Sequence, residues 1–210
     1  MLEIWAHRAD LAEAAINDRH ASKVWGIPGT NLGVVAWPSA SRDELFLHWH
    51  YWWQAHYLDC QIDAFKRGGT NVRAKRLTRT VRGIRTRNLG PLTRNRYYDD
   101  RAWMALALGR MRGLPRVNPP SSLDALEMDI IAGVDSSLGV LPWKTGASFF
   151  NVPANGPMAI MCARSGRLDL AINVADWIGR NLVNDDNLVM DGVRTSMHGP
   201  DVVRDIHPYN

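Results

Sequence analysis

Cysteine is scarce in this chain: its 210 residues include two, Cys60 and Cys162. A small scaffold held together by disulfides needs several paired cysteines, so that class of protein is excluded. Each cysteine falls within a helical pattern, and we expect both to be buried free thiols. Long apolar runs are missing as well, since no stretch approaches the roughly 18 apolar residues of a membrane span. We therefore expect no transmembrane helix.

The amino terminus lacks the apolar core of a signal peptide. Its first residues mix Trp5 with the charged side chains of Glu3, Arg8 and Asp10, and no small-residue cleavage site follows them. We expect a cytoplasmic protein, or an extracellular one if a leader is missing from this sequence.

Strand signals are also weak. Short apolar runs such as 34–36 and 189–193 lack the repeated alternation and the hairpin turns of a β domain, and they are interpreted as loop edges. Helical periodicity is frequent, and 46% hydrophobic residues suit a globular core. The sequence predicts one all-α domain over residues 1–210, with seven helices at 2–20, 43–66, 72–85, 99–111, 121–131, 155–165 and 168–182.

Two adjacent carboxylates, Asp99 and Asp100, stand at the start of the helix predicted over 99–111. Folding does not require this pair, because the two charges repel each other. Glycoside cleavage does require two carboxyl groups, one ionised and one protonated, and adjacent carboxyls could lie the roughly 5–6 Å apart that a retaining mechanism needs. The alternative is helix capping, because aspartate is common in the first turn of a helix.

Aromatic side chains accompany the acidic pair. Tyr98 and Trp103 lie beside it and offer flat faces of the kind that sugar rings stack on. A second aromatic segment, residues 48–64, contains Trp53, and its His56 lies with Trp49 and Trp52 on a stripe with three- and four-residue spacing. Core packing is the preferred interpretation of Trp49 and Trp53. His56 lies near acidic residues, but no second cluster completes a coordination shell, so we expect no metal site.

Residues 139–157 contain three glycines and three prolines, which predicts a long loop that leads into a new helix. Loops of this length often carry function. Trp143 either packs inward or lines a groove. Asn151 and Asn155 can donate and accept hydrogen bonds, as sugar hydroxyls require, although helix capping by Asn155 is an equally good interpretation.

Three segments of the chain carry motifs that occur together in one known family. They are His50-Tyr51-Trp52-Trp53 with Ala55-His56 and Asp63-Ala64; Tyr98-Asp99-Asp100 with Ala102-Trp103; and Leu141-Pro142-Trp143 with Phe150-Asn151 and Pro153-Ala154-Asn155-Gly156-Pro157. In this order, over about residues 48–165, they resemble glycoside hydrolase family 76, the endo-α-1,6-mannanases and their relatives. The resemblance implies an (α/α)6 barrel, a retaining double-displacement mechanism, no cofactor, and α-mannan or another mannose-containing glycan as the partner.

Carried onto this chain, the resemblance implies a role for each site residue. Asp99 is expected to be the nucleophile and Asp100 the acid/base. Arg101 departs from the family pattern, which has a smaller polar residue at that position. The residues expected to bind the glycan are Tyr98, Trp103, Trp143, Asn151, Asn155, Trp53 and His56.

The length of the chain predicts an incomplete barrel. An (α/α)6 barrel has twelve helices, and about seven are predicted in these 210 residues. We expect a C-terminally truncated member whose exposed helix faces are covered by the missing half or by an oligomer. Its activity could be lost through truncation. The alternative is a catalytically silent carbohydrate-binding relic.

A basic segment supports a rival function. Residues 66–96 contain eleven lysines or arginines and no acidic residue, in a chain of net charge +4. Phosphate neutralisation by such a segment would suit a nucleic-acid-binding protein. The segment has no aromatic residue between Phe65 and Tyr97 to stack on bases, so a solvated helix face is the preferred interpretation and no nucleic acid is expected.

Overall fold

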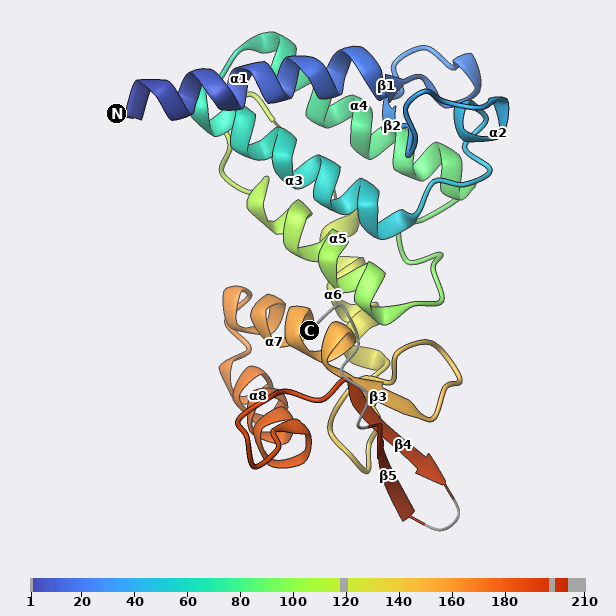
Figure 1. The fold of residues 1–210 in the computed structure, drawn as a ribbon, viewed down its shortest axis with the longest axis vertical. Coiled ribbons are helices and arrows are strands. Elements are labelled where there is room, and N and C mark those ends of the chain that lie inside the picture. Colours follow the sequence, from blue (N-terminus) through green and yellow to red (C-terminus); the bar gives the residue numbers. More distant parts are fainter. Residues whose placement is uncertain (1, 118–120, 197–198, 204–210) are drawn as a thin grey trace. The chain divides into compact units, whose positions relative to one another are not determined.

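The computed structural model describes residues 2–117, 121–196 and 199–203. The sequence predicts a single partial domain, and the chain divides into two compact units. The first unit comprises Met1–Arg94 and Ala107–Leu123, and the second comprises Asn95–Leu106 and Asp124–Asn210. Each unit is described by itself (Figure 1).

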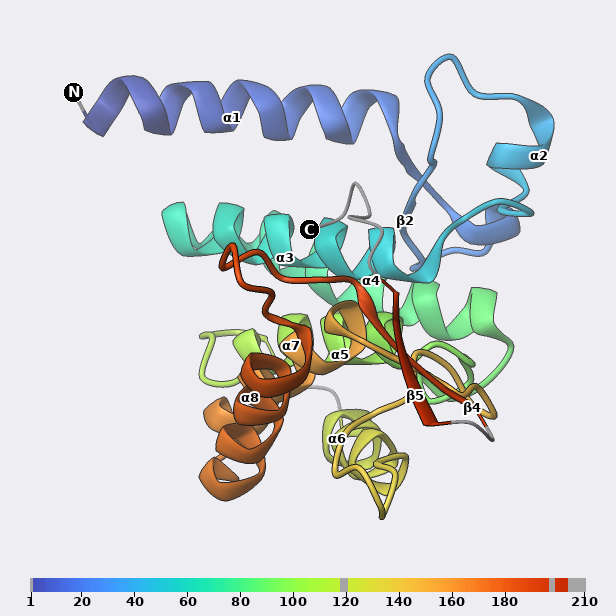
Figure 2. The same cartoon turned by 60° about the horizontal axis from the view of Figure 1, so that its bottom comes forward.

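The first unit is built around two antiparallel helices, α3 (Tyr51–Arg67) and α4 (Asn71–Asn88), which lie side by side in Figures 1 and 2. Gly68 and Gly69 turn the chain between them, and the Thr70 side chain caps α4 by accepting a hydrogen bond from the Arg73 amide. The other elements of this unit are α1 (Leu2–Arg19), β1 (Ala21–Ser22), the 3-10 turn η1 (Val24–Gly26), β2 (Leu32–Gly33) and α2 (Ser41–Glu44).

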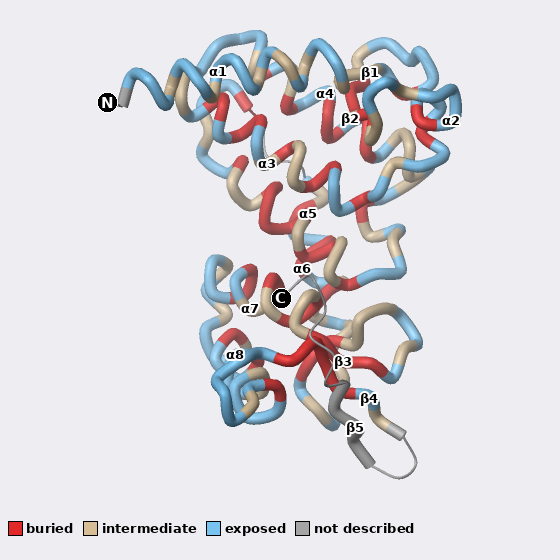
Figure 3. Tube along the Cα trace, viewed as in Figure 1, coloured by how far each residue is buried: buried red, intermediate tan, exposed pale blue. Residues whose placement is uncertain are grey.

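The core of the first unit lies between α3 and α4 (Figure 3). Leu58 and Ile62 on α3, and Leu77 and Ile84 on α4, are completely buried, as their helical spacing predicts. A polar chain crosses this core, because Asn31 donates to the Thr80 hydroxyl (2.8 Å), which donates to Gln61 (2.9 Å). These hydrogen bonds fix the loop before β2 against both helices.

Helix α1 is held by ion pairs. None of its residues from Glu3 to Arg19 is buried. Instead, its Glu13 accepts from Arg73 of α4 at 2.5 Å and from Arg67 of α3 at 3.0 Å. Arginines of the basic segment are therefore engaged in ion pairs, which differs from the expected solvated face and reduces the charge available for a phosphate backbone.

The prediction of a single helix over 43–66 is wrong. The structure has α2 and α3, with a break in which Phe46 and His50 take positive φ angles of 53° and 43°. Phe46 is completely buried, and its carbonyl accepts a hydrogen bond from Arg87 Nε at 2.6 Å. Burial of this ring outweighs continuation of the helix.

The second unit combines helices with a small sheet. It contains most of α6 (Ser122–Ala132) and the first part of α5 (Tyr98–Arg110), whose last residues belong to the first unit. Its other helices, α7 (Val152–Arg164) and α8 (Leu168–Leu182), pack against each other. The sheet is antiparallel in the order β3 (Phe149–Asn151), β4 (Gly192–Ser196) and β5 (Gly199–Val203).

This sheet corrects the expectation that 189–193 is only a loop edge. Phe150 pairs with Val193, and Gly192 pairs with Val203. A Cβ on Gly192 would lie 2.5 Å from the Phe150 carbonyl oxygen, so the close approach of β3 requires glycine there. The fold remains mainly helical, as predicted: the described residues form eight helices, seven of which match the predicted ranges or part of them.

Two further expectations concern exposure. Cys162 is a buried free thiol, as expected, but Cys60 is exposed, because it lies on a face of α3 that does not meet α4. Within the described ranges, no helix is both long enough and apolar enough to span a membrane.

Gly83 in the middle of α4 provides a test of the packing in the first unit. A Cβ there would lie 2.2 Å from the Asn31 carbonyl oxygen, which is backbone and cannot rotate away. We expect Gly83→Ala to lower the free energy of unfolding by about 1–3 kcal/mol, measured by urea denaturation.

Gly109→Ala is the matched control for Gly83→Ala. Gly109 also lies inside a helix, α5, and an added Cβ would meet no described atom within 4 Å. This variant should gain about 0.5–1 kcal/mol from its helix propensity. If the two substitutions changed the free energy of unfolding equally, the close packing of Asn31 against α4 would be contradicted.

Candidate active site

The acidic pair occupies the first turn of α5, as predicted. Just before the helix, the Asn95 side chain accepts a hydrogen bond from the Tyr97 amide at 2.7 Å and so closes a turn. Asp99 and Asp100 follow this turn, and both are half-buried. The pair therefore lies at the end of the helix rather than deep within it.

A backbone pairing joins the start of α5 to the loop predicted over 139–157. The Tyr98 amide donates to the Trp143 carbonyl (3.0 Å), and the Thr145 amide donates to the Arg96 carbonyl (2.9 Å). The loop itself folds back, since the Trp143 amide donates to the Phe149 carbonyl at 2.7 Å. These bonds place the Trp143 indole next to the acidic pair.

Asp99 receives two hydrogen bonds. Its Oδ1 accepts from the Asp100 amide at 2.9 Å, and its Oδ2 accepts from Trp143 Nε1 at 3.1 Å. Burial raises the pKa of Asp99 above its usual range, and these two donors oppose the rise because they stabilise the charged form. Asp99 is thus the member of the pair that is better prepared to carry a negative charge.

Asp100 is the better proton carrier. Burial is the main cause that raises its pKa to about 7, the charge of Asp99 adds to the rise, and the hydrogen bond from Asn95 Nδ2 (2.8 Å) and the charge of Arg101 oppose it. The sequence indicated only that the two charges repel each other. In the structure, burial outweighs repulsion.

Two residues that flank the pair form a structural stack. Tyr98 is buried, and a Cβ on Gly133 would lie 2.2 Å from its ring, so the ring passes directly over the α6 C-terminal turn. The Arg101 guanidinium lies over the same ring at 3.9 Å. A sugar contact by Tyr98 stays a prediction, and the burial of the Tyr98 ring disfavours this contact.

Asn151 and Asn155 are both buried. Asn151 is the N-cap of α7 and accepts from the Ala154 amide at 3.3 Å. The Asn155 side chain clamps Leu141, accepting from its amide and donating to its carbonyl, each at 2.8 Å. Both asparagines shape the loop, which disfavours the predicted contact with sugar hydroxyls.

The aromatic residues predicted to bind sugar occupy different environments. Trp103 is half-buried on α5, and Trp143 is half-buried beside Asp99. Trp53 and His56 lie on α3 in the first unit, where Trp53 is 40% exposed rather than packed in a core. His56 contacts Trp52 edge-on at a ring separation of 5.7 Å. Sugar binding by these four residues stays a prediction.

Sequence reasoning missed three features of the site. Asn95, the Trp143 N–H group and Asp129 all act on the acids or on their neighbour Arg101. The turn-forming position of Asn95 was visible in the sequence. The other two depend on segments that are distant along the chain and meet only in the folded unit.

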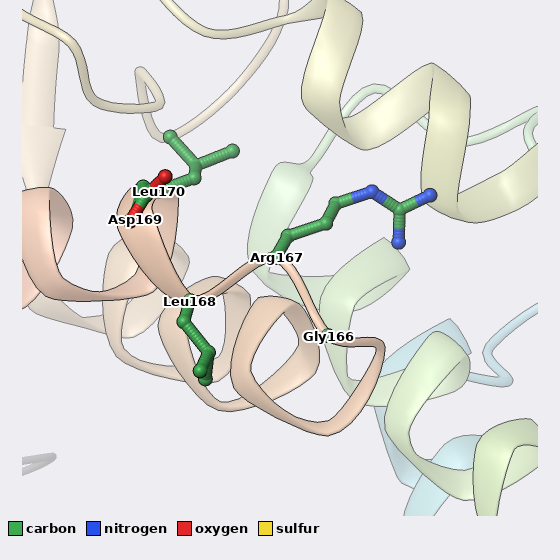
Figure 4. Close-up of a pocket in the computed structure, with 5 residues that line it drawn as sticks. All are labelled: Gly166, Arg167, Leu168, Asp169 and Leu170. Atoms are coloured by element: carbon green, nitrogen blue, oxygen red, sulfur yellow. The ribbon is translucent and has the colours of Figure 1, made fainter.

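Other features of the second unit offer fewer groups that are suited to catalysis or binding. A depression of about 440 Å³ is lined by Gly166, Arg167, Leu168, Asp169 and Leu170, and Figure 4 shows that the side chains of Arg167, Leu168 and Leu170 point in different directions. No convergent set of polar groups forms there. Within the part of the chain that the structure describes, no group of three or more histidine, cysteine, aspartate or glutamate residues could hold a metal ion.

The amino-acid sequence matches no family model and no curated protein. Solved structures do match the fold. The α-1,6-mannanase GH76A from Salegentibacter sp. HEL1_6 superposes with a TM-score of 0.79 at 23% identity, covering 96% of this chain and 59% of that enzyme. A Listeria innocua protein matches equally well, at 21% identity, covering 95% of this chain and 59% of its own.

Two further structures are informative. One is an inactive variant of the Salegentibacter enzyme, with two adjacent aspartates replaced by asparagine, in complex with α-1,6-mannotriose (TM-score 0.78, 22% identity, 96% and 59% coverage). The other is a family 76 glycoside hydrolase from Bacteroides thetaiotaomicron (TM-score 0.73, 11% identity, 95% and 48% coverage). This chain therefore has the fold of part of a family 76 glycoside hydrolase, and it spans about 59% of the length of the first of these proteins.

The burial of Asp100 predicts an unusual dependence of stability on pH. Its folded-state pKa of about 7 lies above the unfolded value of about 3.9, so its contribution to stability is fully present below pH 4 and is lost as pH rises through 7. We expect Asp100→Asn to raise the free energy of unfolding at pH 8 by about 2–4 kcal/mol, with the gain shrinking towards pH 4. Urea denaturation between pH 4 and 8 measures this.

Asp135→Asn is the control for Asp100→Asn. Hydrogen bonds from Ser137 and Leu138 lower the pKa of Asp135, so this carboxylate stabilises the fold at neutral pH and its replacement should have the opposite sign. If Asp100→Asn were no more stable than the wild type at pH 8, Asp100 would not be a buried acid.

Proposed function

We propose that this chain carries the catalytic acids of a retaining glycoside hydrolase that cleaves α-1,6-linked mannan. The observation that carries the proposal is the pair of adjacent, half-buried carboxyls, Asp99 and Asp100, with different environments at the start of α5. The resemblance of the motifs and the fold shared with α-1,6-mannanases support the same substrate class. An inactive variant with two adjacent aspartates replaced, bound to α-1,6-mannotriose, supports the assignment by analogy.

The environments of the two acids assign their roles. Asp99 accepts two N–H donors, which stabilise its ionised form, so it attacks the anomeric carbon as the nucleophile. Asp100 holds a proton up to a pH of about 7, so it protonates the bridging oxygen as the glycosidic bond breaks. The products of this step are a covalent glycosyl-enzyme and the released half of the glycan.

The second step regenerates the enzyme. Asp100, now ionised, takes a proton from water, and this water attacks the anomeric carbon and displaces Asp99. Two inversions leave the anomeric configuration unchanged. Trp143 adds to this mechanism by keeping its N–H group on Asp99 Oδ2, which orients the nucleophile.

A relic that binds glycan without cleaving it is the second candidate. The chain spans 59% of the length of the mannanase that it matches, so part of the structure found in that enzyme has no counterpart in these residues. The candidates share the acidic pair and the aromatic residues and differ only in turnover.

The test compares Asp99→Asn and Asp100→Asn with the wild-type protein on α-1,6-mannan. We expect each variant to lose activity by about 100-fold or more while still binding an α-1,6-manno-oligosaccharide. Reducing-end release measures activity, calorimetry measures binding, and proton NMR of the first product reports its anomeric configuration. Activity should also fall as pH rises through about 7, because Asp100 loses its proton.

Asp169→Asn is the matched control. Asp169 is an exposed aspartate in the first turn of α8, so it shares the helix position of the acidic pair, and its replacement should leave activity unchanged. Products of inverted configuration would contradict the retaining mechanism. A wild-type protein that binds the oligosaccharide and never cleaves it would support the relic instead.

A further inference from the structure

A buried cation stands next to the proposed acid. Arg101 follows Asp100 in α5, and its side chain is 5% exposed. A positive charge close to a carboxyl favours the ionised form. Arg101 acts on Asp100 in this direction and opposes the rise of the pKa of Asp100. An uncompensated guanidinium at this position would therefore remove the proton that the acid has to deliver.

Contacts from elsewhere in the second unit hold the Arg101 guanidinium. Its Nη1 forms a short ion pair with Asp129 Oδ2 of α6, and its Nη2 donates to the Thr145 hydroxyl at 3.3 Å. Its flat face covers the Tyr98 ring at 3.9 Å. Tyr98 is itself fixed against the Gly133 backbone, so the stack leaves the guanidinium little freedom.

We propose that Asp129 is a positioning residue of this site: it holds and neutralises the Arg101 guanidinium, so that Asp100 keeps its proton although a cation is its neighbour. This inference rests on the proposed role of Asp100 as acid/base. A counter-charge is needed because an arginine side chain stays positively charged in a protein. Only a neighbouring negative charge can reduce the effect of Arg101 on Asp100.

Three other charged groups of the unit have different contacts. Asp99 precedes Asp100 in the same helix turn and raises the pKa of Asp100, whereas Asn95 contributes a neutral donor. On α6, Glu127 is paired with Arg167 at 3.2 Å. In the loop, the Lys144 ammonium lies over the Trp143 ring at 5.1 Å. Asp129 is thus the carboxylate that meets Arg101.

The test is an NMR titration of the Asp100 carboxyl in the whole 210-residue protein. We expect Asp129→Asn to lower its midpoint by about 1 pH unit, because Arg101 keeps its charge and loses its counter-charge. The matched control is Glu127→Gln, which removes a buried carboxylate from the same helix, one that is paired with Arg167. It should leave the midpoint unchanged. Asp129→Glu, which keeps the charge, should restore the wild-type midpoint.

A double-mutant cycle separates action through Arg101 from direct action on Asp100. In an Arg101→Met background, Asp129→Asn should no longer move the Asp100 midpoint. An equal shift in both backgrounds would overturn the proposal, as would an unchanged midpoint in Asp129→Asn. If Asp129→Asn fails to fold, Arg101→Lys tests the same idea, because lysine keeps the charge but cannot form the forked contact, and the midpoint should again fall.

This titration also distinguishes the inference from the proposed function, because it needs no turnover. A wild-type protein that does not cleave mannan would remove the proposed function, and the shift could still be observed. An active wild-type protein whose Asp100 midpoint ignores Asp129 would remove only this inference. In the active protein, the alkaline limb of the pH–activity profile should move down by about the same 1 unit in Asp129→Asn.

Discussion

Two neighbouring carboxyls are withdrawn from water at the start of α5, and the remaining features of the site follow from that burial. An ionised carboxylate loses hydration in such a place, so the pKa of both members is raised, that of Asp100 to about 7. The two N–H donors on Asp99 and the charge of Asp99 on Asp100 then decide which member keeps the proton. Burial raises the pKa of both carboxyls, and the hydrogen bonds that each carboxyl accepts make this rise smaller.

Hydrogen bonds of the surrounding loop hold the start of α5 in this geometry. Asn155 clamps the backbone at Leu141, the chain then pairs with the segment before α5, and Trp143 is thereby placed with its N–H group on Asp99. Two asparagines that suit sugar hydroxyls by their chemistry, Asn151 and Asn155, thus hydrogen-bond to the backbone. Their buried hydrogen bonds provide the rigidity that the proposed catalytic carboxylates require.

The helices were predictable because their periodicity is local. The chain between Glu44 and Tyr51 was mispredicted because the burial of Phe46 is a tertiary effect that no local pattern expresses. The sheet was missed for a similar reason: β3 and β4 are separated by α7 and α8, so their pairing is not visible as a hairpin. Core packing was the preferred interpretation of Trp53, and its exposure reflects which face of α3 meets α4.

The amino-acid sequence by itself determined the adjacency of Asp99 and Asp100, their place at a helix start, and the motifs that resemble family 76. These are properties of neighbouring residues and of their order. Only the tertiary structure decided which acid holds the proton, which carboxylate restrains Arg101, and which asparagines are buried. Desolvation and charge depend on groups that are distant along the chain and become neighbours only on folding.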